Sequence, residues 1–257
     1  MNPMQLRSAD DAAVTSDDLS VARGGSRVAE GISFRLAPGG ALAIMGPTGA
    51  GKSSLVGVLA GADDPSLTVV GGSARVEGIS VRKGGRSLRV RRYVTGYLAQ
   101  GAGAALPARL TVSEVIGEPV TSRDRRVNQR ALSLRIAGLL DELQLPLGAA
   151  TKYPYELSSG MRQRVALARA LVLDPRVFIG DDPYANLDLE VRQAARDALL
   201  RRRGEHAMAM LVVTNDPVTV AELDADVLVL RAGHPVGFGH GMADVLWTPD
   251  GGSRIAS

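Results

Sequence analysis

The sequence predicts an α/β fold with a mostly parallel sheet. Short apolar strands alternate along the chain with helical patterns, and a glycine-rich loop joins one of these strands directly to a helix. Parallel strands need crossover connections, so strands interleaved with helices favour this arrangement. The most apolar strand candidates are residues 39–46, 176–181, 209–214 and 226–230.

The bulk composition fits one globular domain. The chain has 257 residues, of which 45% are hydrophobic and 22% charged, and this is ordinary for a well-buried core. The absence of cysteine excludes disulfide and thiolate chemistry. The net charge of +3 is too small to indicate nucleic-acid binding, and we interpret the basic clusters at 82–92 and 123–130 as solvated faces. No stretch resembles a signal peptide or a membrane span.

The N-terminal part predicts strands around one helix. Residues 1–16 are polar and are expected to form a flexible tail. Residues 19–23, 32–36 and 73–81 read as strands, the last one as a strand or hairpin. Residues 39–46 form an apolar strand bounded by glycines, which we expect to be buried on both faces. A helix follows from Lys52 and ends at Gly61, a suitable C-cap.

The chain becomes helical after about Gly101. Residues 110–120 and 128–145 predict helices, and residues 160–173 predict an amphipathic helix that ends before Asp174-Pro175. We therefore expect a helical subdomain at about 102–160, inserted into a single domain that spans 17–248 and precedes a C-terminal tail at 249–257.

The segment GPTGAGKSS carries the clearest chemistry. It follows a predicted strand and opens a predicted helix, which is the context of a phosphate-binding P-loop. Glycines let the backbone N–H groups curl toward phosphate oxygens, and the helix N-terminus favours anions. Lys52 is expected to bind the β and γ phosphates, and the Ser53 hydroxyl is expected to ligate Mg²⁺. The predicted ATP-binding residues of the loop are Gly46, Pro47, Thr48, Gly49, Ala50, Gly51, Lys52, Ser53 and Ser54.

Two adjacent acids, Asp181 and Asp182, end a second apolar strand. In P-loop NTPases an acid at this place holds the Mg²⁺, so Asp181 is the expected metal ligand. Asp182 is then placed to polarise an attacking water. The alternative interpretation of Asp182 is an N-cap or turn residue ahead of Pro183.

Five segments in order resemble the nucleotide-binding subunit of ATP-binding cassette (ABC) transporters. They are YLAQ with Gln100, the signature-like LSSGM at 157–161, VFIGD, ANLD with Asp188, and VTND with Asn215. The resemblance covers about 17–248 and implies a P-loop NTPase core, an antiparallel β subdomain and an inserted helical subdomain. The segments KYPYELSSGMRQR and LPARLTVSEVIGEPV look most like the ATPases of oligopeptide and dipeptide importers.

The resemblance also implies roles and partners. Gln100 touches Mg²⁺ and the attacking water, and Asn215 stands at the switch position beside the γ phosphate. The signature residues and the D-loop aspartate complete the ATP site of a second ABC subunit, in a homodimer or a heterodimer. Integral membrane subunits would be the transport partners, at the cytoplasmic face of the membrane. The signature and D-loop residues are Ser158, Ser159, Gly160, Met161 and Asp188.

Several positions depart from the family pattern. The usual glutamate is Asp182, which pulls the carboxylate back by roughly 1 to 1.5 Å, and a misplacement of that order can cost about 10²-fold in rate. The switch histidine is Asn215, which donates a hydrogen bond but carries no charge. Arg23 stands where an aromatic stacks on adenine, and its guanidinium can also stack. Signature positions are changed at Ser159 and Met161.

These departures leave three interpretations. The first is a transport-coupled ATPase with reduced turnover at its own site. The second is a degenerate subunit that binds ATP, pairs with an active sister ATPase and has a structural or regulatory role. Independently of these, Asn215 can be a loop residue after a strand, with no role of its own. The third is a non-transport ABC protein that acts on DNA or ribosomes, which the length of 257 residues disfavours.

Overall fold

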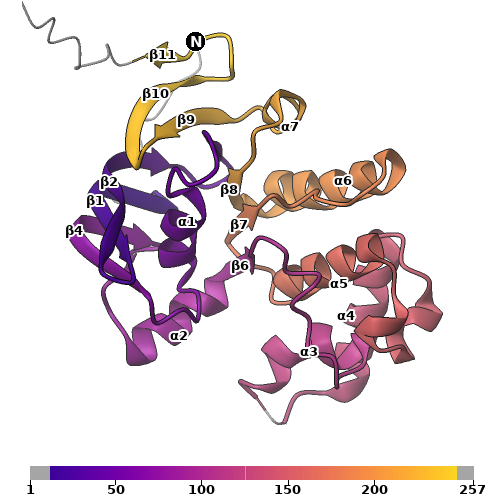
Figure 1. Cartoon of the computed structure of the whole chain (residues 1–257). Helices are drawn as coiled ribbons and strands as arrows, with labels where there is room; N and C mark the ends of the chain where they lie inside the picture. Colours follow the sequence, from indigo (N-terminus) through magenta and orange to yellow (C-terminus); the bar gives the residue numbers. More distant parts are fainter. Residues whose placement is uncertain (1–11, 125, 248–257) are drawn as a thin grey trace, which may run out of the picture.

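The computed structural model describes residues 12–124 and 126–247. Two sheets and a group of helices make up the fold (Figure 1). The strands are β1 (Val14–Arg23), β2 (Ser26–Leu36), β3 (Ala41–Met45), β4 (Leu67–Val76), β5 (Ile79–Ser80), β6 (Thr95–Leu98), β7 (Val177–Asp181), β8 (Ala209–Val213), β9 (Asp226–Arg231), β10 (His234–His240) and β11 (Leu246–Trp247). The helices are α1 (Lys52–Ala60), α2 (Gly85–Val94), α3 (Val112–Thr121), α4 (Gln129–Glu142), α5 (Ser159–Leu171), α6 (Leu189–His206) and α7 (Pro217–Glu222), with 3₁₀ turns at Leu147–Thr151 and Pro154–Glu156.

The larger sheet is mostly parallel, as predicted. Its strand order is β11-β10-β9-β3-β8-β7-β6, and every pair from β9 to β6 is parallel. All five residues of β3, of β7 and of β8 are buried, which fits strands covered on both faces. The carboxyl ends of β3 and β7 therefore deliver the P-loop and the paired aspartates to the same edge of the sheet.

Helix α1 packs between the two sheets. Its residues from Ser54 to Ala60 are all buried, and the apolar ones among them belong to one cluster with strands of both sheets. The predicted end at Gly61 is confirmed: this glycine has a left-handed φ of 73°, and its N–H donates to the Val58 carbonyl. The P-loop helix is thus held rigidly by packing along its length.

The four-stranded sheet is antiparallel, in the order β2-β1-β4-β5. Its first strand begins at Val14, and both Ala13 and Val14 are buried, so the expected tail over 1–16 is too long by several residues. The sequence pattern hides this start because a bulge at Asp18, with a left-handed φ of 48°, interrupts the alternation of the strand. The expected tails at 1–11 and 249–257 lie outside the described residues.

The inserted helices α3, α4 and α5 pack against one another, to one side of the sheets (Figure 1). Thr111 begins α3 with a capping box: its side chain accepts from the Glu114 N–H, and the Glu114 carboxylate accepts from the Thr111 N–H. The helices predicted at 110–120, 128–145 and 160–173 are confirmed as α3, α4 and α5. In the described part of the chain, no helix is both long and apolar enough to cross a membrane.

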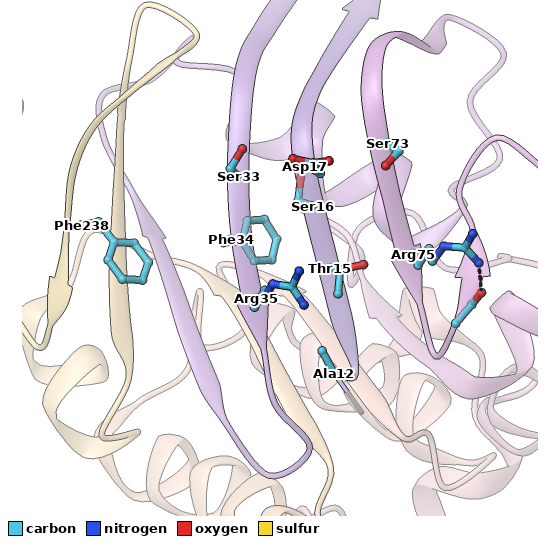
Figure 2. A pocket seen from close by; sticks show the side chains of 11 residues that line it. Ala12, Thr15, Ser16, Asp17, Ser33, Phe34, Arg35, Ser73, Arg75 and Phe238 are labelled. Atoms are coloured by element: carbon cyan, nitrogen blue, oxygen red, sulfur yellow. Dashed lines mark hydrogen bonds between the residues drawn. The ribbon is translucent and has the colours of Figure 1, made fainter. Parts of the chain in front are cut away.

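A hollow with a volume of about 920 Å³ lies on the outer face of the antiparallel sheet. Figure 2 shows its side chains on neighbouring strands, with Phe238 of β10 at one side and Arg75 bonded to the Gly78 carbonyl. Polar residues such as Thr15 and Ser33 alternate with buried ones here, as on the solvated face of an ordinary antiparallel sheet. This hollow contains no residue of the P-loop.

Candidate nucleotide-binding site

Two glycines of the P-loop lie too close to neighbouring strands for any side chain. A Cβ at Gly46 would stand 2.0 Å from the Leu230 carbonyl oxygen in β9, and one at Gly51 would stand 2.0 Å from the Val28 oxygen in β2. Both glycines also have positive φ, 134° and 89°. The loop therefore fits tightly between the two sheets, and its path depends on these two residues.

The loop borders a pocket of about 450 Å³. Most of the residues predicted for nucleotide and metal binding meet there, although they come from five separate parts of the sequence. Val28, Val213 and Thr214 also line the pocket; Val213 and Thr214 belong to the VTND segment, whereas no motif pointed to Val28. The full lining is Arg23, Val28, Thr48, Gly49, Ala50, Gly51, Lys52, Ser53, Ser54, Gln100, Asp181, Asp182, Val213, Thr214 and Asn215.

Lys52 is held over the loop by main-chain oxygens. Its ammonium donates to the Gly46 carbonyl at 2.6 Å and to the Pro47 carbonyl at 2.8 Å. The sequence predicts that these two residues bind ATP, but they do not line the pocket themselves; their carbonyls hold the lysine. A phosphate chain entering the pocket offers this cation stronger, charged acceptors.

Asp181 is a buried carboxylate with an unused oxygen. The residue is 3% exposed, and its Oδ2 has no hydrogen-bond partner. Burial raises the pKa of Asp181, a hydrogen bond from Ser53 lowers it, and the charges of Asp182 and Lys52 act in opposite directions. An unsatisfied buried oxygen is costly unless a donor or cation meets it.

The site fits Mg²⁺. This ion prefers oxygen ligands and is usually held by one or two carboxylates together with phosphate oxygens and water. The Asp181 carboxylate, the Ser53 hydroxyl and the Gln100 amide oxygen supply such ligands at one pocket. Among residues 12–124 and 126–247 there is no cluster of three or more His, Cys, Asp or Glu that could hold a metal without a phosphate.

Asp182 lies in a strained turn and also lines the pocket. Its φ of 57° is left-handed, its N–H donates to the Val213 carbonyl at 3.0 Å, and its own carbonyl accepts from the Ala185 N–H. The interpretation as a turn residue is therefore confirmed, and the role of Asp182 toward an attacking water stays a prediction. Aspartate adopts the left-handed region more readily than most residues do, so this backbone suits the residue that the chain carries.

Asn215 is oriented by the P-loop itself. Its Oδ1 accepts from the Gly46 N–H at 3.0 Å, which leaves the amide NH₂ as the group free to donate to a ligand. The next residue, Asp216, caps α7 by accepting from the Val218 N–H, and it pairs with Arg192 of α6 at 2.5 Å. Burial would raise the pKa of Asp216, but hydrogen bonds from Arg192 and Thr219 hold it below its ordinary value.

The signature and D-loop residues do not line this pocket. The Ser158 hydroxyl caps α5 by accepting from the Met161 N–H, and the Asp188 carboxylate caps α6 by accepting from the Val191 N–H. A Cβ at Gly160 would lie 3.1 Å from the Asn186 carbonyl oxygen, so these two loops touch each other. Helix α5 begins in the inserted helical part, separate from α1 (Figure 1).

Arg23 is bonded to two neighbours through the edge of its guanidinium, so stacking through the face of this group stays a prediction. Its Nε donates to the Ser54 hydroxyl at 3.1 Å, and its Nη1 pairs with Asp64 at 3.2 Å. The Asp64 carboxylate also accepts hydrogen bonds from the side chain and the N–H of Ser66, which lower its pKa.

The ion pair between Arg192 and Asp216 was not predicted from the sequence. Asp216 stands directly ahead of a proline, and this pattern is typical of the start of a helix.

Comparison with known proteins gives the same picture. A family model described as ABC transporter matches residues 29–185. An Fe(3+) ions import ATP-binding protein of Pseudomonas fluorescens is 33% identical over 213 residues, which are 83% of this chain and 57% of that protein. A sulfate/thiosulfate import ATP-binding protein of Vibrio vulnificus is 35% identical over 79% of this chain and 56% of its own length. The chain thus spans a little more than half of these relatives.

The fold also matches solved structures. A dimeric ATP-binding cassette in a post-hydrolysis state with ADP and Pi superposes with a TM-score of 0.79 at 24% identity, over 88% of this chain and 98% of that one. A chain from an ABC transporter complex of Clostridium perfringens gives a TM-score of 0.74 at 22% identity, over 90% of this chain and 89% of that one. With the P-loop, the second acidic strand and the inserted helices in place, the chain belongs to the ABC transporter family.

Proposed function

We propose that this chain is the ATP-binding subunit of an ABC importer and hydrolyses ATP to drive membrane partner subunits. The observation that carries the proposal is the unpartnered, buried Oδ2 of Asp181, beside Ser53 and within one pocket with Lys52. A bound metal would satisfy this oxygen, and phosphate oxygens would give the lysine charged acceptors in place of its two carbonyls. A pocket built only for packing would not leave the buried oxygen of Asp181 without a partner.

Each residue of the pocket has a role in ATP binding or hydrolysis that follows from its position. The N–H groups of the loop and the start of α1 bind the phosphate chain, and Lys52 balances its charge. When bound, Mg²⁺ neutralises charge on the phosphate oxygens. The Asn215 amide NH₂ donates to the terminal phosphate, because its oxygen is already committed to the Gly46 N–H. Asp182 orients the attacking water and accepts its proton.

The reaction needs a second subunit. The signature residues 158–161 stand at the N-terminus of α5 and do not line their own chain's P-loop pocket. Facing the pocket of another cassette, they supply the missing side of the site. The dimeric ATP-binding cassette that shares this fold supports the same arrangement.

Turnover at this chain's own site is expected to be slow. The Asp182 carboxylate is set back relative to a glutamate, and its left-handed backbone fixes where the side chain starts. Asn215 donates without carrying a charge. Both features act on hydrolysis and leave phosphate binding intact.

Import at the cytoplasmic face of a membrane is part of the proposal. The relatives reported above are named as import ATP-binding proteins for Fe(3+) ions and for sulfate or thiosulfate. Neither of them is named as an oligopeptide or dipeptide importer, the group that two sequence segments resemble. The inference that the transported solute is a peptide therefore rests on those segments alone. The names of the relatives favour an inorganic ion as the solute instead.

Phosphate release by the purified chain, with its membrane partners and without them, tests the proposal. Lys52→Ala is the control, and the double variant Asp182→Glu/Asn215→His is the rescue. We expect slow turnover that Lys52→Ala abolishes and the double variant increases. ATP binding with no turnover in any of these samples would instead support the degenerate, regulatory subunit.

A further inference from the structure

Positive charge is concentrated in one part of the chain. Residues 78–130 contain 11 of the 30 Lys and Arg residues but only 3 of the 27 Asp and Glu residues, a net charge of +8. The whole chain carries +3, so the other residues together carry −5. An asymmetry of this kind is typical of chains that contact nucleic acid or a membrane surface.

Helix α2 presents one exposed stripe within this segment. Four of its residues follow one another at spacings of three, one and three positions and all are exposed, so they share the solvent face of the helix. Two are the cations Arg86 and Arg89, and the others are Val90 and Tyr93, which are 44% and 49% exposed. Helices that lie on a membrane surface combine cations with aliphatic and aromatic side chains in this way. The first turn of α2 contains no acid, so nothing there compensates Arg86 at the positive end of the helix dipole.

The second basic cluster adjoins this stripe. The Arg123 guanidinium lies over the Tyr93 ring, 5.2 Å from its centroid, and Tyr93 lines one pocket together with Val120 and Val127. The loop between α3 and α4 therefore lies next to the end of α2, and Figure 1 shows α2 and α3 along the lower edge of the molecule. We call the exposed cations of these two clusters that form no side-chain hydrogen bond or ion pair with any described residue the basic strip. It consists of Arg86, Arg89, Arg126 and Arg130.

The charges of the basic strip are not compensated from within the described chain. Arginines on α6 show the contrast, because Arg192, Arg196, Arg201 and Arg202 all form ion pairs with glutamate or aspartate. Behind the stripe, Arg91 is only 3% exposed, and its Nε and Nη1 have no hydrogen-bond partner. Burial and the charge of Arg92 lower the pKa of Arg91, but an arginine stays charged at neutral pH and adds to the positive potential of this face.

We propose that the basic strip lies on the anionic lipid headgroups of the membrane surface, so that this chain contacts lipid directly as well as its membrane partner subunits. The inference rests on the proposed function, because it describes how the same subunit is held at the membrane. The arginines bind lipid phosphates, while Val90 and Tyr93 meet the level of the headgroups, where aromatic side chains are favoured. A nucleic acid offers phosphates but no apolar layer for Val90, so the composition of the stripe favours lipid.

Co-sedimentation of the full chain with lipid vesicles, in the absence of nucleotide, tests the proposal. One set of vesicles is phosphatidylcholine alone, and the other is an equal mixture of phosphatidylcholine and phosphatidylglycerol. A cation close to an anionic surface adds about fivefold to partitioning, so four of them predict a preference of at least about 100-fold for the mixed vesicles. The preference should fall steeply between about 0.1 M and about 1 M salt, because the Debye length shrinks from about 10 Å to about 3 Å.

A matched pair of triple variants separates the basic strip from net charge. Arg86→Gln/Arg89→Gln/Arg126→Gln removes three of its four cations and should leave a preference of only about fivefold. Arg27→Gln/Arg201→Gln/Arg231→Gln removes three exposed arginines from β2, α6 and β9, with the same change in net charge. This control should alter the preference by less than about threefold, because salt screens charges that do not lie at the surface of contact.

Equal binding to both kinds of vesicle, or an equal loss in both triple variants, would overturn the proposal. Tighter binding of a DNA duplex than of the mixed vesicles, lost in the variant of the basic strip, would assign this face to nucleic acid and overturn it too. Lys52→Ala should bind vesicles like the wild type. Missing vesicle binding with intact, Lys52-dependent turnover would refute this inference alone, whereas missing turnover with intact vesicle binding would count only against the proposed function.

Discussion

Replacing Asn215 by aspartate changes one group and leaves the anchor of the side chain intact. The new carboxylate can still accept from the Gly46 N–H, which stands 3.0 Å from Oδ1 in the wild-type chain. The amide NH₂, however, becomes a second oxygen that carries negative charge. The variant therefore tests whether this position donates to the terminal phosphate, with little change in shape.

The size of the effect follows from two terms. Losing a hydrogen bond to a charged group costs about 1.5–3 kcal/mol. A like charge at about 4 Å adds up to about 4 kcal/mol at an effective dielectric constant near 20, reduced by solvent and by the metal. We expect the dissociation constant for ATP to rise about 100-fold, which is about 2.7 kcal/mol. ADP lacks the terminal phosphate, so its constant should change by less than about threefold, or about 0.7 kcal/mol.

Calorimetric titration with Mg-ATP and Mg-ADP, together with steady-state phosphate release, measures this difference. Asn215→Ala is the matched control, because it removes the donor without adding charge and should fall between wild type and aspartate. Equal weakening of ATP and ADP by Asn215→Asp, or none at all, would show that residue 215 does not face the terminal phosphate. The orientation inferred from the Gly46 bond would then be wrong.

Three further predictions concern the support of the site. Arg192→Met removes the ion pair that holds Asp216, the neighbour of Asn215, and should lower kcat at least about tenfold with little change in ATP affinity. Arg196→Met is the control: this arginine lies on the same helix but is bonded to Asp197 and Glu222, and its loss should not lower kcat in this way. In urea unfolding, Gly46→Ala should cost more than about 2 kcal/mol because its Cβ meets a carbonyl at 2.0 Å, while Gly138→Ala in the open interior of α4 should gain about 0.5–1 kcal/mol. The hydrogen bond to Asp226 and the charge of Asp224 raise the pKa of His240, so its stabilising contribution should be full below pH 6.5 and lost as pH rises through the higher folded value; NMR titration should show this shift shrinking in Asp226→Asn.

Much of the fold could be predicted because local signals agree with the tertiary structure. The apolar run ending at Gly46 becomes β3, buried on both faces, and Gly61 caps α1 in the left-handed conformation that only glycine adopts freely. The start of β1 was misplaced because the bulge at Asp18 breaks its alternation. Helix α6 was not predicted from the sequence, although Asp188 caps its start.

The parts of the site whose residues are adjacent in one motif could be predicted from the sequence. The contacts between residues far apart in the chain could not. Lys52 and Ser53 are adjacent in one motif, and Asp181 ends a recognisable strand. The bond between Gly46 and Asn215 joins positions 169 residues apart, and the Arg23 contacts with Ser54 and Asp64 also depend on how the hairpin folds over α1. No local pattern encodes these contacts, so the orientation of Asn215 and the fastening of Arg23 appear only in three dimensions.

Phosphate release by the purified wild-type chain, compared directly with Lys52→Ala under saturating Mg-ATP, tests the central claim most directly. The P-loop pocket, with Asp181 as metal ligand and Asp182 as base, predicts slow turnover that disappears in the Lys52→Ala variant. Turnover that persists unchanged without Lys52 would place the chemistry elsewhere. Complete absence of turnover in the wild type, alone and with its membrane partners, would contradict the assignment of Asp182 as a working base.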